Sequence, residues 1–171
     1  MKVAILTISD RSSAGEREDL SGPRISQRMT DESWSVVKTD ILPDDRSGIE
    51  AYLIETCDSG QVDLILTTGG TGFAPRDQAP EATKAVIERA APGLSEAMRL
   101  ASLKKTPHAM LSRGVTGIRA RTLIVNLPGS PRAASENLDV ILPVLEHAIA
   151  LIRDDPDAEA GHQPRPKPRL A

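Results

Sequence analysis

The sequence predicts an α/β fold: a three-layer α/β/α sandwich with a mostly parallel central sheet. Short apolar runs rich in β-branched residues recur at residues 2–9, 36–42, 62–68 and 122–127. Each run is followed by residues typical of turns or helix caps, and helical segments lie between the runs. This alternation favours parallel strands joined by right-handed crossovers, with helices on both faces of the sheet.

Five helices are predicted between and after these strands. They span residues 22–30, 47–57, 80–90, 92–104 and 131–153. Prolines stand in the first turn of four of them, where a missing amide costs no hydrogen bond. In the last helix, apolar residues recur at spacings of three and four, which predicts a core-facing stripe with a kink at Pro143.

The chain length of 171 residues corresponds to one domain of ordinary size. We expect this domain to span residues 1–153, because residues 154–171 hold four of the thirteen prolines and no apolar period, which is typical of a solvated tail. No apolar run approaches the roughly 18 residues of a membrane span. The first residues carry no cleavage signal for secretion, so we expect a cytoplasmic protein.

Composition argues against several classes of function. The net charge is −3, from 21 basic and 24 acidic residues, so no general attraction to nucleic acid is expected. Only Trp34, Tyr52 and Phe73 are aromatic, so any nucleotide must be held largely by backbone and polar groups. A single cysteine, Cys57, excludes an internal disulfide, and with three histidines the chain offers no zinc cluster.

The third predicted strand leads into a glycine-rich loop, with Gly69, Gly70, Thr71 and Gly72 in succession. Glycines let the backbone approach an anion and turn its amides towards it, and a threonine hydroxyl adds a donor, which suits phosphate. The loop lacks both the G-x-G-x-x-G dinucleotide pattern and the lysine of a P-loop. A tight turn between strand and helix is the alternative interpretation.

Two carboxylates are expected to face one crevice, because Asp77 follows the glycine-rich loop and Asp44 follows the second strand. A carboxylate beside an anion-binding turn is unfavourable unless a cation lies between them or Arg76 neutralises it. Mg²⁺ is commonly held by one or two carboxylates together with substrate phosphates, so Asp44 and Asp77 are candidate metal ligands. Alternatively, each aspartate caps a helix or closes a turn.

Three further loops add candidates. The first strand leads into a long polar loop with Ser9 and Asp10, which either binds a ligand or is simply solvated. Residues 128–130 follow the fourth strand, where a glycine and a helix N-terminus could receive an anion or form a bare turn. Residues 111–121 predict a glycine-bearing hairpin with three arginines, which either grips phosphates or lies in solvent.

Together these motifs resemble the molybdopterin adenylyltransferase family, which includes the bacterial enzyme and the G domains of the plant molybdenum-cofactor protein and of gephyrin. The resemblance covers about residues 2–153, and several motifs in one order are far more specific than a single glycine run. The motifs are residues 8–10, 19–23, 42–44, 68–77, 80–83, 92–94, 111–113 and 126–131.

This resemblance implies Mg²⁺-dependent transfer of AMP from ATP to the terminal phosphate of molybdopterin, with release of pyrophosphate, in molybdenum cofactor biosynthesis. Asp44 and Asp77 match the essential acidic pair of the family, and residues 69–72 match its nucleotide phosphate loop. The remaining candidate nucleotide and pterin contacts are Ser9, Asp10, Ser112, Arg113, Pro128, Gly129 and Ser130. A homotrimer and a downstream molybdate-inserting partner are also implied. A molybdopterin-binding paralogue without catalysis and a trimeric scaffold domain are the alternatives.

Overall fold

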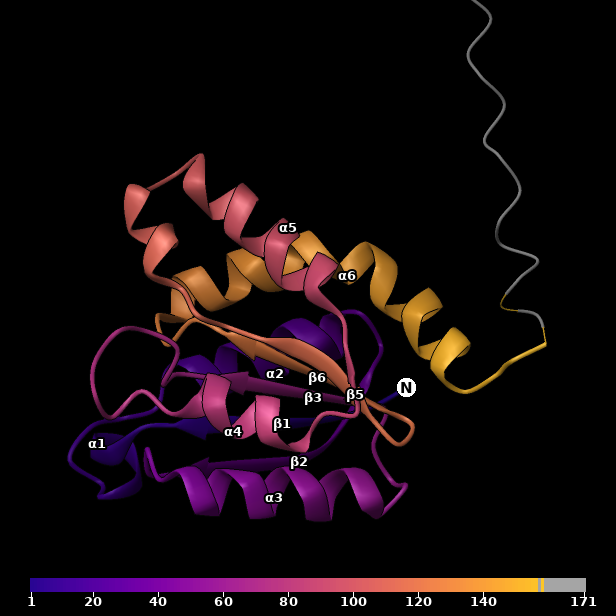
Figure 1. Cartoon of the computed structure of the whole chain (residues 1–171), viewed down its shortest axis with the longest axis horizontal. Helices are drawn as coiled ribbons and strands as arrows, with labels where there is room; N and C mark the ends of the chain where they lie inside the picture. The colour runs from indigo at the N-terminus through magenta and orange to yellow at the C-terminus, as the bar shows by residue number, and fades with distance from the viewer. Residues whose placement is uncertain (157, 159–171) are drawn as a thin grey trace, which may run out of the picture.

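The computed structural model describes residues 1–156 and residue 158. Strands and helices alternate along most of the chain (Figure 1). In order, the elements are β1 (Lys2–Ile8), α1 (Asp10–Ser13), α2 (Ser21–Asp31), β2 (Ser35–Leu42), α3 (Arg46–Asp58), β3 (Leu64–Thr68), α4 (Ala79–Val86), β4 (Arg89–Ala90), α5 (Pro92–Leu103), the 3-10 helix η1 (Pro107–Leu111), β5 (Thr116–Arg119), β6 (Thr122–Leu127) and α6 (Pro131–Ile152).

Within the described residues the sheet has six strands, in the order β2-β1-β3-β6-β5-β4. The first four are parallel, and β5 runs antiparallel both to β6 and to β4. Ile8 pairs with Leu42, and Thr68 pairs with Leu127, so the parallel strands end nearly level. The loops that follow them therefore emerge at one edge of the sheet.

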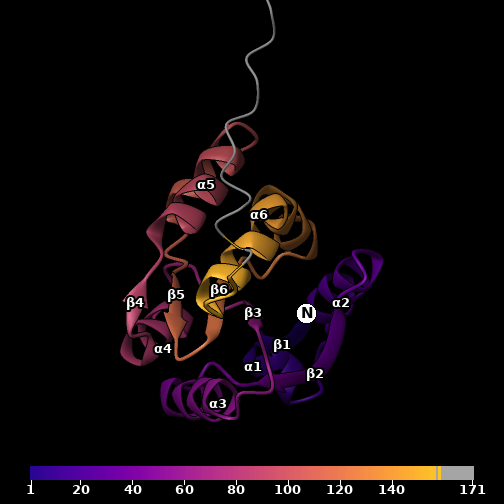
Figure 2. The same ribbon diagram turned by 90° about the vertical axis from the view of Figure 1, so that its right-hand side faces the viewer.

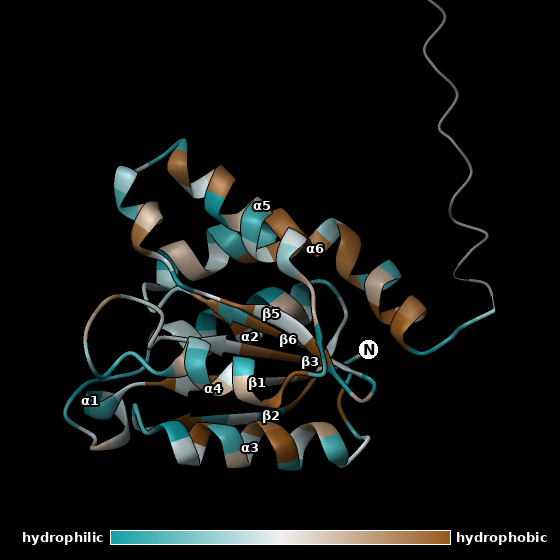
Figure 3. Ribbon diagram, in the orientation of Figure 1, coloured by the Kyte–Doolittle hydropathy of each residue, from teal (hydrophilic) through white to brown (hydrophobic). Residues whose placement is uncertain are grey.

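Two apolar clusters cover the two faces of the sheet. One joins strands to α2, α5 and α6, and the other joins them to α3 and α4. Adjacent β1 residues alternate between them: Ile5 belongs to the first cluster and Leu6 to the second, and both are at most 1% exposed. Figure 2 shows the helices on either side of the sheet, and Figure 3 shows apolar residues along its central strands. The three-layer α/β/α prediction is confirmed.

One predicted helix is shorter than expected. The segment 80–90 is helical only to Val86, and Arg89 and Ala90 form strand β4. Ile87 has extended backbone angles, and the Glu88 amide donates to the Ile118 carbonyl at 2.8 Å. Pairing with β5 therefore replaces the last helical turn, a tertiary effect that helical periodicity does not reveal.

The predicted hairpin lies further along the chain than expected. Residues 107–111 form η1, and the hairpin consists of β5 and β6, with Ala120 at a φ of 49° in the turn. The other predicted strands and helices agree with the structure to within two residues at each end. Pro143 lies inside α6, which continues to Ile152. Most of the predicted tail, residues 154–171, lies outside the described residues, and its solvated character stays a prediction.

Within the part of the chain that the structure describes, no helix combines the length and apolar character needed to cross a membrane.

Candidate functional site

A crevice of about 410 Å³ lies at the edge where the parallel strands end. We call it the acidic crevice, because three aspartates and one arginine are the charged side chains that line it: Asp19, Asp44, Asp77 and Arg17. Its other lining residues come from the ends of β1 and β3, from α1 and the start of α2, from the glycine-rich loop and from the start of α6 with the turn before it. The loops after four strands therefore converge as the topology predicts.

The glycine-rich loop crosses this edge in a conformation that only glycine adopts easily. Gly69 and Gly70 have φ angles of 102° and 59°, in the left-handed region. The amide of Ala79 donates to the Gly70 carbonyl at 3.2 Å and closes the loop before α4. Two consecutive left-handed residues turn the chain sharply from β3, which keeps its backbone against the crevice.

Each predicted acidic residue lies against a glycine of this loop. A Cβ atom placed on Gly70 would lie 2.9 Å from Asp44 Oδ1, and one on Gly72 would lie 2.9 Å from Asp77 Oδ2. Both carboxylates line the acidic crevice. The structure thus brings together two side chains that are 33 positions apart in sequence, and larger residues at either glycine would meet them.

The pKa of the Asp44 carboxyl reflects this arrangement. Burial raises the pKa of its carboxyl, and the nearby carboxylates of Asp10 and Asp77 raise it further, while hydrogen bonding with Asp10 and the charge of Arg76 lower it. A cation in the crevice would relieve the repulsion among these groups.

Asp10 lies just outside the crevice and holds its rim. Its carboxylate accepts hydrogen bonds from Arg76 Nε at 2.9 Å and Arg76 Nη2 at 2.6 Å, a two-point ion pair. Asp10 also exchanges hydrogen bonds with Asp44: each backbone amide donates to the other residue's carboxylate, at 2.9 and 3.0 Å. Arg76 keeps the pKa of Asp10 below its usual value, so Asp10 stays ionised in this network.

A second cavity of about 290 Å³ adjoins the loop on the side of α5, η1 and α6. We call it the side pocket, and it contains four predicted site residues: Thr71, Gly72, Ser112 and Pro128. Thr68 Oγ1 donates to the Pro128 carbonyl at 2.7 Å, and Ser21 Oγ donates to the Gly129 carbonyl at 2.8 Å. These bonds fix the turn between the two cavities, since Gly129 and Ser130 line the acidic crevice.

Two of the three arginines of the predicted hairpin bond to other protein groups. Arg119 forms a two-point ion pair with Asp58, with bonds of 2.9 and 2.8 Å. Arg113 bonds to Glu81, to the Gly72 carbonyl of the glycine-rich loop and to the Asp77 carbonyl that follows the loop. Neither residue lines the acidic crevice or the side pocket.

Ser9 lines the acidic crevice and caps α1, because its hydroxyl accepts the Ser12 amide at 3.2 Å. Ser130 caps α6 by accepting the Ala133 amide at 3.5 Å. The first turn of α6 thus faces the crevice with a capped, partly positive end.

Sequence reasoning did not select Arg17 or Asp19 as site residues. Asp19 accepts bonds from the Thr7 hydroxyl at 2.6 Å and from the Ser21 amide at 2.9 Å, so it secures the wall of the crevice. Both residues lie in the long polar loop after β1, and the length and polarity of that loop are the features of the sequence that could have identified them.

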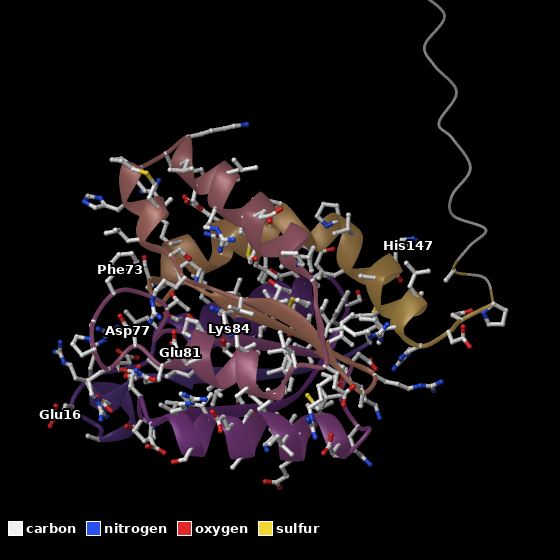
Figure 4. The ribbon with its side chains drawn as sticks, in the orientation of Figure 1. Glu16, Phe73, Asp77, Glu81, Lys84 and His147 are labelled. Atoms are coloured by element: carbon white, nitrogen blue, oxygen red, sulfur yellow. The ribbon has the colours of Figure 1, made fainter. Side chains whose placement is uncertain are left out.

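Of the three aromatic residues, Phe73 alone belongs to the glycine-rich loop. It is 66% exposed, whereas Tyr52 is 9% exposed, and Trp34 packs against the core. Figure 4 shows Phe73 on the loop, with Asp77 and Glu81 following it at the same end of the sheet.

The donor set of the acidic crevice fits a divalent cation shared with a phosphate ligand. Among the described residues no three side chains of His, Cys, Asp or Glu form a complete metal site. Asp44 and Asp77 supply two hard carboxylates beside backbone suited to phosphate, and Mg²⁺ typically takes one or two carboxylates plus phosphate oxygens and water.

Comparison with known proteins agrees with the motifs. Residues 4–147 match the family described as "Probable molybdopterin binding domain". The molybdopterin adenylyltransferase of Helicobacter pylori strain J99 is 44% identical over 152 residues, which cover 88% of this chain and 86% of that protein. Gephyrin of Dictyostelium discoideum is 43% identical over 175 residues, covering 96% of this chain and 24% of gephyrin.

A solved structure gives the same result for the fold. The molybdopterin biosynthesis enzyme MoaB of Thermus thermophilus is 48% identical, with a TM-score of 0.85. The match covers 91% of this chain and 98% of that one. These matches confirm the resemblance inferred from the motifs, and the chain belongs to the family described as "Probable molybdopterin binding domain".

Proposed function

We propose that this protein is a molybdopterin adenylyltransferase, which transfers AMP from ATP to the terminal phosphate of molybdopterin and releases pyrophosphate. The observation that carries the proposal is the position of Asp44 and Asp77, each against a glycine of one phosphate-suited loop in a shared crevice. Relatives named molybdopterin adenylyltransferase at 41–44% identity support the reaction and its place in molybdenum cofactor biosynthesis.

In this reaction an oxygen of the pterin phosphate attacks the α-phosphorus of ATP, and the bond from that phosphorus to pyrophosphate breaks. A phosphate monoester is already an anion near neutral pH, so no general base is required. The barrier lies in bringing two anions together, which makes positioning and charge neutralisation the main tasks of the site.

The residues of the acidic crevice suit those tasks. Asp44 and Asp77 would hold Mg²⁺ on the triphosphate, and the ion would neutralise charge on the phosphate oxygens. Backbone amides of residues 69–72 would bind the oxygens of the transferred phosphoryl group. The remaining candidate contacts are Ser9, Asp10, Ser112, Pro128, Gly129 and Ser130, which lie in or beside the two cavities.

The two adjoining cavities give this site room for two ring-bearing substrates. The side pocket and the acidic crevice both border the glycine-rich loop, through Gly72 and Gly70 respectively. One substrate ring could enter each cavity while the phosphates meet at the loop between them. Phe73, which directly follows Gly72 and is exposed, is the one aromatic side chain among the loop residues.

The resemblance further supports a homotrimer, a cytoplasmic location and a partner that inserts molybdate into the adenylated product. Exposed apolar side chains on α5 and η1, including Leu100 and Met110 at 63% and 65%, are candidates for a subunit interface. Sedimentation equilibrium of the full chain tests the trimer directly.

The reaction is tested by incubating the protein with molybdopterin, ATP and Mg²⁺ and measuring pyrophosphate and adenylated pterin. Both products should appear together in equal amounts, and neither should form when EDTA removes the metal. Tight binding of molybdopterin without either product would identify a binding paralogue instead. If the protein neither binds molybdopterin nor forms product, a scaffold domain would be favoured.

A further inference from the structure

Arg113 is placed to brace the glycine-rich loop. Its Nε donates to the Gly72 carbonyl at 2.6 Å, and its Nη2 donates to the Asp77 carbonyl at 2.6 Å. The Arg113 amide donates to the Thr71 carbonyl at 2.9 Å. One residue from the segment before β5 therefore holds three carbonyls along the loop, on both sides of Phe73.

Glu81 anchors this brace from α4. Its Oε1 accepts a bond from Arg113 Nη1 at 2.5 Å, and both side chains are 32% exposed. Its Oε2 is buried without a hydrogen-bond partner among the described residues. The ion pair with Arg113 is the contact that offsets the desolvation of this carboxylate, so each of the two side chains fixes the other.

The braced segment carries the Asp77 side chain. Asp77 Oδ2 accepts the Ala74 amide at 2.8 Å, and the Asp77 amide donates to the Ala74 carbonyl at 2.9 Å. These bonds span only three residues, so alone they leave the segment free to move relative to the sheet. The two carbonyl bonds of Arg113 join both ends of the segment to a point outside it.

We infer that Arg113, held by Glu81, is a positioning residue: it fixes the loop that presents Asp77 and does not itself contact the phosphates. All three of its side-chain nitrogens donate to protein oxygens, so this bracing role takes the place of the direct phosphate contact expected from the sequence. This inference rests on the proposed function for the role of Asp77, whereas the bracing itself does not depend on turnover.

The test compares Arg113→Met, Arg113→Lys and Glu81→Gln with the matched control Arg119→Met. Like Arg113, Arg119 pairs with a carboxylate, that of Asp58, and bonds to a backbone carbonyl, that of Val86 at 3.2 Å, but it lies away from both cavities. Two readouts are needed: amide hydrogen exchange of residues 71–79, and the Mg²⁺ concentration that gives half-maximal pyrophosphate release.

Arg113→Met should accelerate exchange in residues 71–79 and raise the half-saturating Mg²⁺ concentration about tenfold, as is typical for loss of a group that orients a metal ligand. Glu81→Gln should change both in the same direction by less. Arg113→Lys should give exchange rates and a Mg²⁺ requirement between those of Arg113→Met and the unsubstituted protein, because an ammonium cannot reach both carbonyls and Glu81 in one geometry. Arg119→Met should match the unsubstituted protein in both measurements.

Unchanged exchange in a folded Arg113→Met protein would overturn the inference. So would an unchanged or lowered Mg²⁺ requirement in Glu81→Gln, because release of Arg113 from Glu81 would then favour a direct role on the phosphates. If Arg113→Met does not fold, Glu81→Gln decides the question. Failure of the proposed function would appear differently, as absent pyrophosphate release in the unsubstituted protein, and the exchange measurement would still test the brace.

Discussion

Gly69 lies so close to the end of β1 that a Cβ atom on it would be 2.1 Å from the carbonyl oxygen of Ile8. Its amide also donates to the Leu127 carbonyl at 3.3 Å, so the residue is held between two neighbouring strands. The glycine-rich loop can leave β3 in this direction only because position 69 has no side chain. Backbone packing, and not phosphate binding alone, therefore requires this glycine.

Gly69→Ala should destabilise the protein by about 3 kcal/mol, since the strained φ and the backbone clash act together. Gly15→Ala is the control: its φ is 74°, but no atom of the described residues lies within 4 Å of the added Cβ. That change should cost about 1 kcal/mol, from the left-handed backbone alone. Urea unfolding of both variants measures the difference, and equal losses would show that the contact with Ile8 is unimportant.

Asp77→Asn should lower the pKa of Asp44, because it removes one of the carboxylates that raise it. Carbon-13 NMR of the Asp44 carboxyl in the absence of Mg²⁺ measures this pKa in both proteins. A pKa that is unchanged or raised in the variant would mean that the two groups do not interact.

The raised pKa of Asp44 also has a consequence for stability. The Asp44 carboxyl contributes favourably to folding stability; this contribution is complete below the ordinary aspartate pKa of 3.8 and is lost as the pH rises through its raised pKa. Asp44→Asn should therefore unfold at a melting temperature equal to or above that of the unsubstituted protein at pH 7. A lower melting temperature at pH 7 would indicate that the ionised carboxylate stabilises the fold.

Asn126 holds a buried polar network beneath the site. Its Nδ2 donates to Thr67 Oγ1 and Thr83 Oγ1, both at 2.9 Å, and its Oδ1 accepts the Val115 amide at 3.1 Å. Asn126→Ala leaves these groups unpaired and should cost about 3 kcal/mol. Thr116→Val should be neutral or stabilising, because the Thr116 hydroxyl is buried with no hydrogen-bond partner among the residues that the structure describes. Calorimetry of both variants checks the contrast, which similar losses would contradict.

Cys57 should not react in the folded protein. It is 2% exposed, and burial raises the pKa of its thiol to about 11, so little thiolate forms near neutral pH. A thiol reagent at pH 7.5 should modify the unfolded chain at least 100-fold faster than the native one, as roughly expected when reaction needs an opened state. Comparable rates would show that the α3 region opens readily.

The sequence predicts the central strands well because their residues are apolar on both faces, as in β3, which is fully buried. It also places Asp44 and Asp77 at one edge, because parallel strands fix where their loops emerge. It misplaces the end of α4, because Ile87 is extended by pairing with β5, and Gly117 of β5 gives it room: a Cβ there would lie 2.6 Å from Ile87 Cδ1.

The roles of the arginines show the limit of local motifs. Arg113 and Arg119 occur in a segment whose composition suits phosphate binding, yet their partners lie 32 to 61 positions away. Which carboxylate an arginine meets is decided by the packing of α3 and α4 against the sheet. Residue type and spacing identify the charge, and only the assembled fold identifies its partner.

The most direct test of the account is the turnover of Asp44→Asn, Asp77→Asn and the double variant, with Asp45→Asn as control. Asp45 caps α3 by accepting the Gly48 amide at 2.8 Å, a role that asparagine also performs. If Asp44 and Asp77 hold one ion, each single change should lower AMP transfer by a factor on the order of 10³, and the double change should add little. Asp45→Asn should retain full activity. Near-normal transfer in either single variant, or losses that multiply in the double variant, would contradict the shared site.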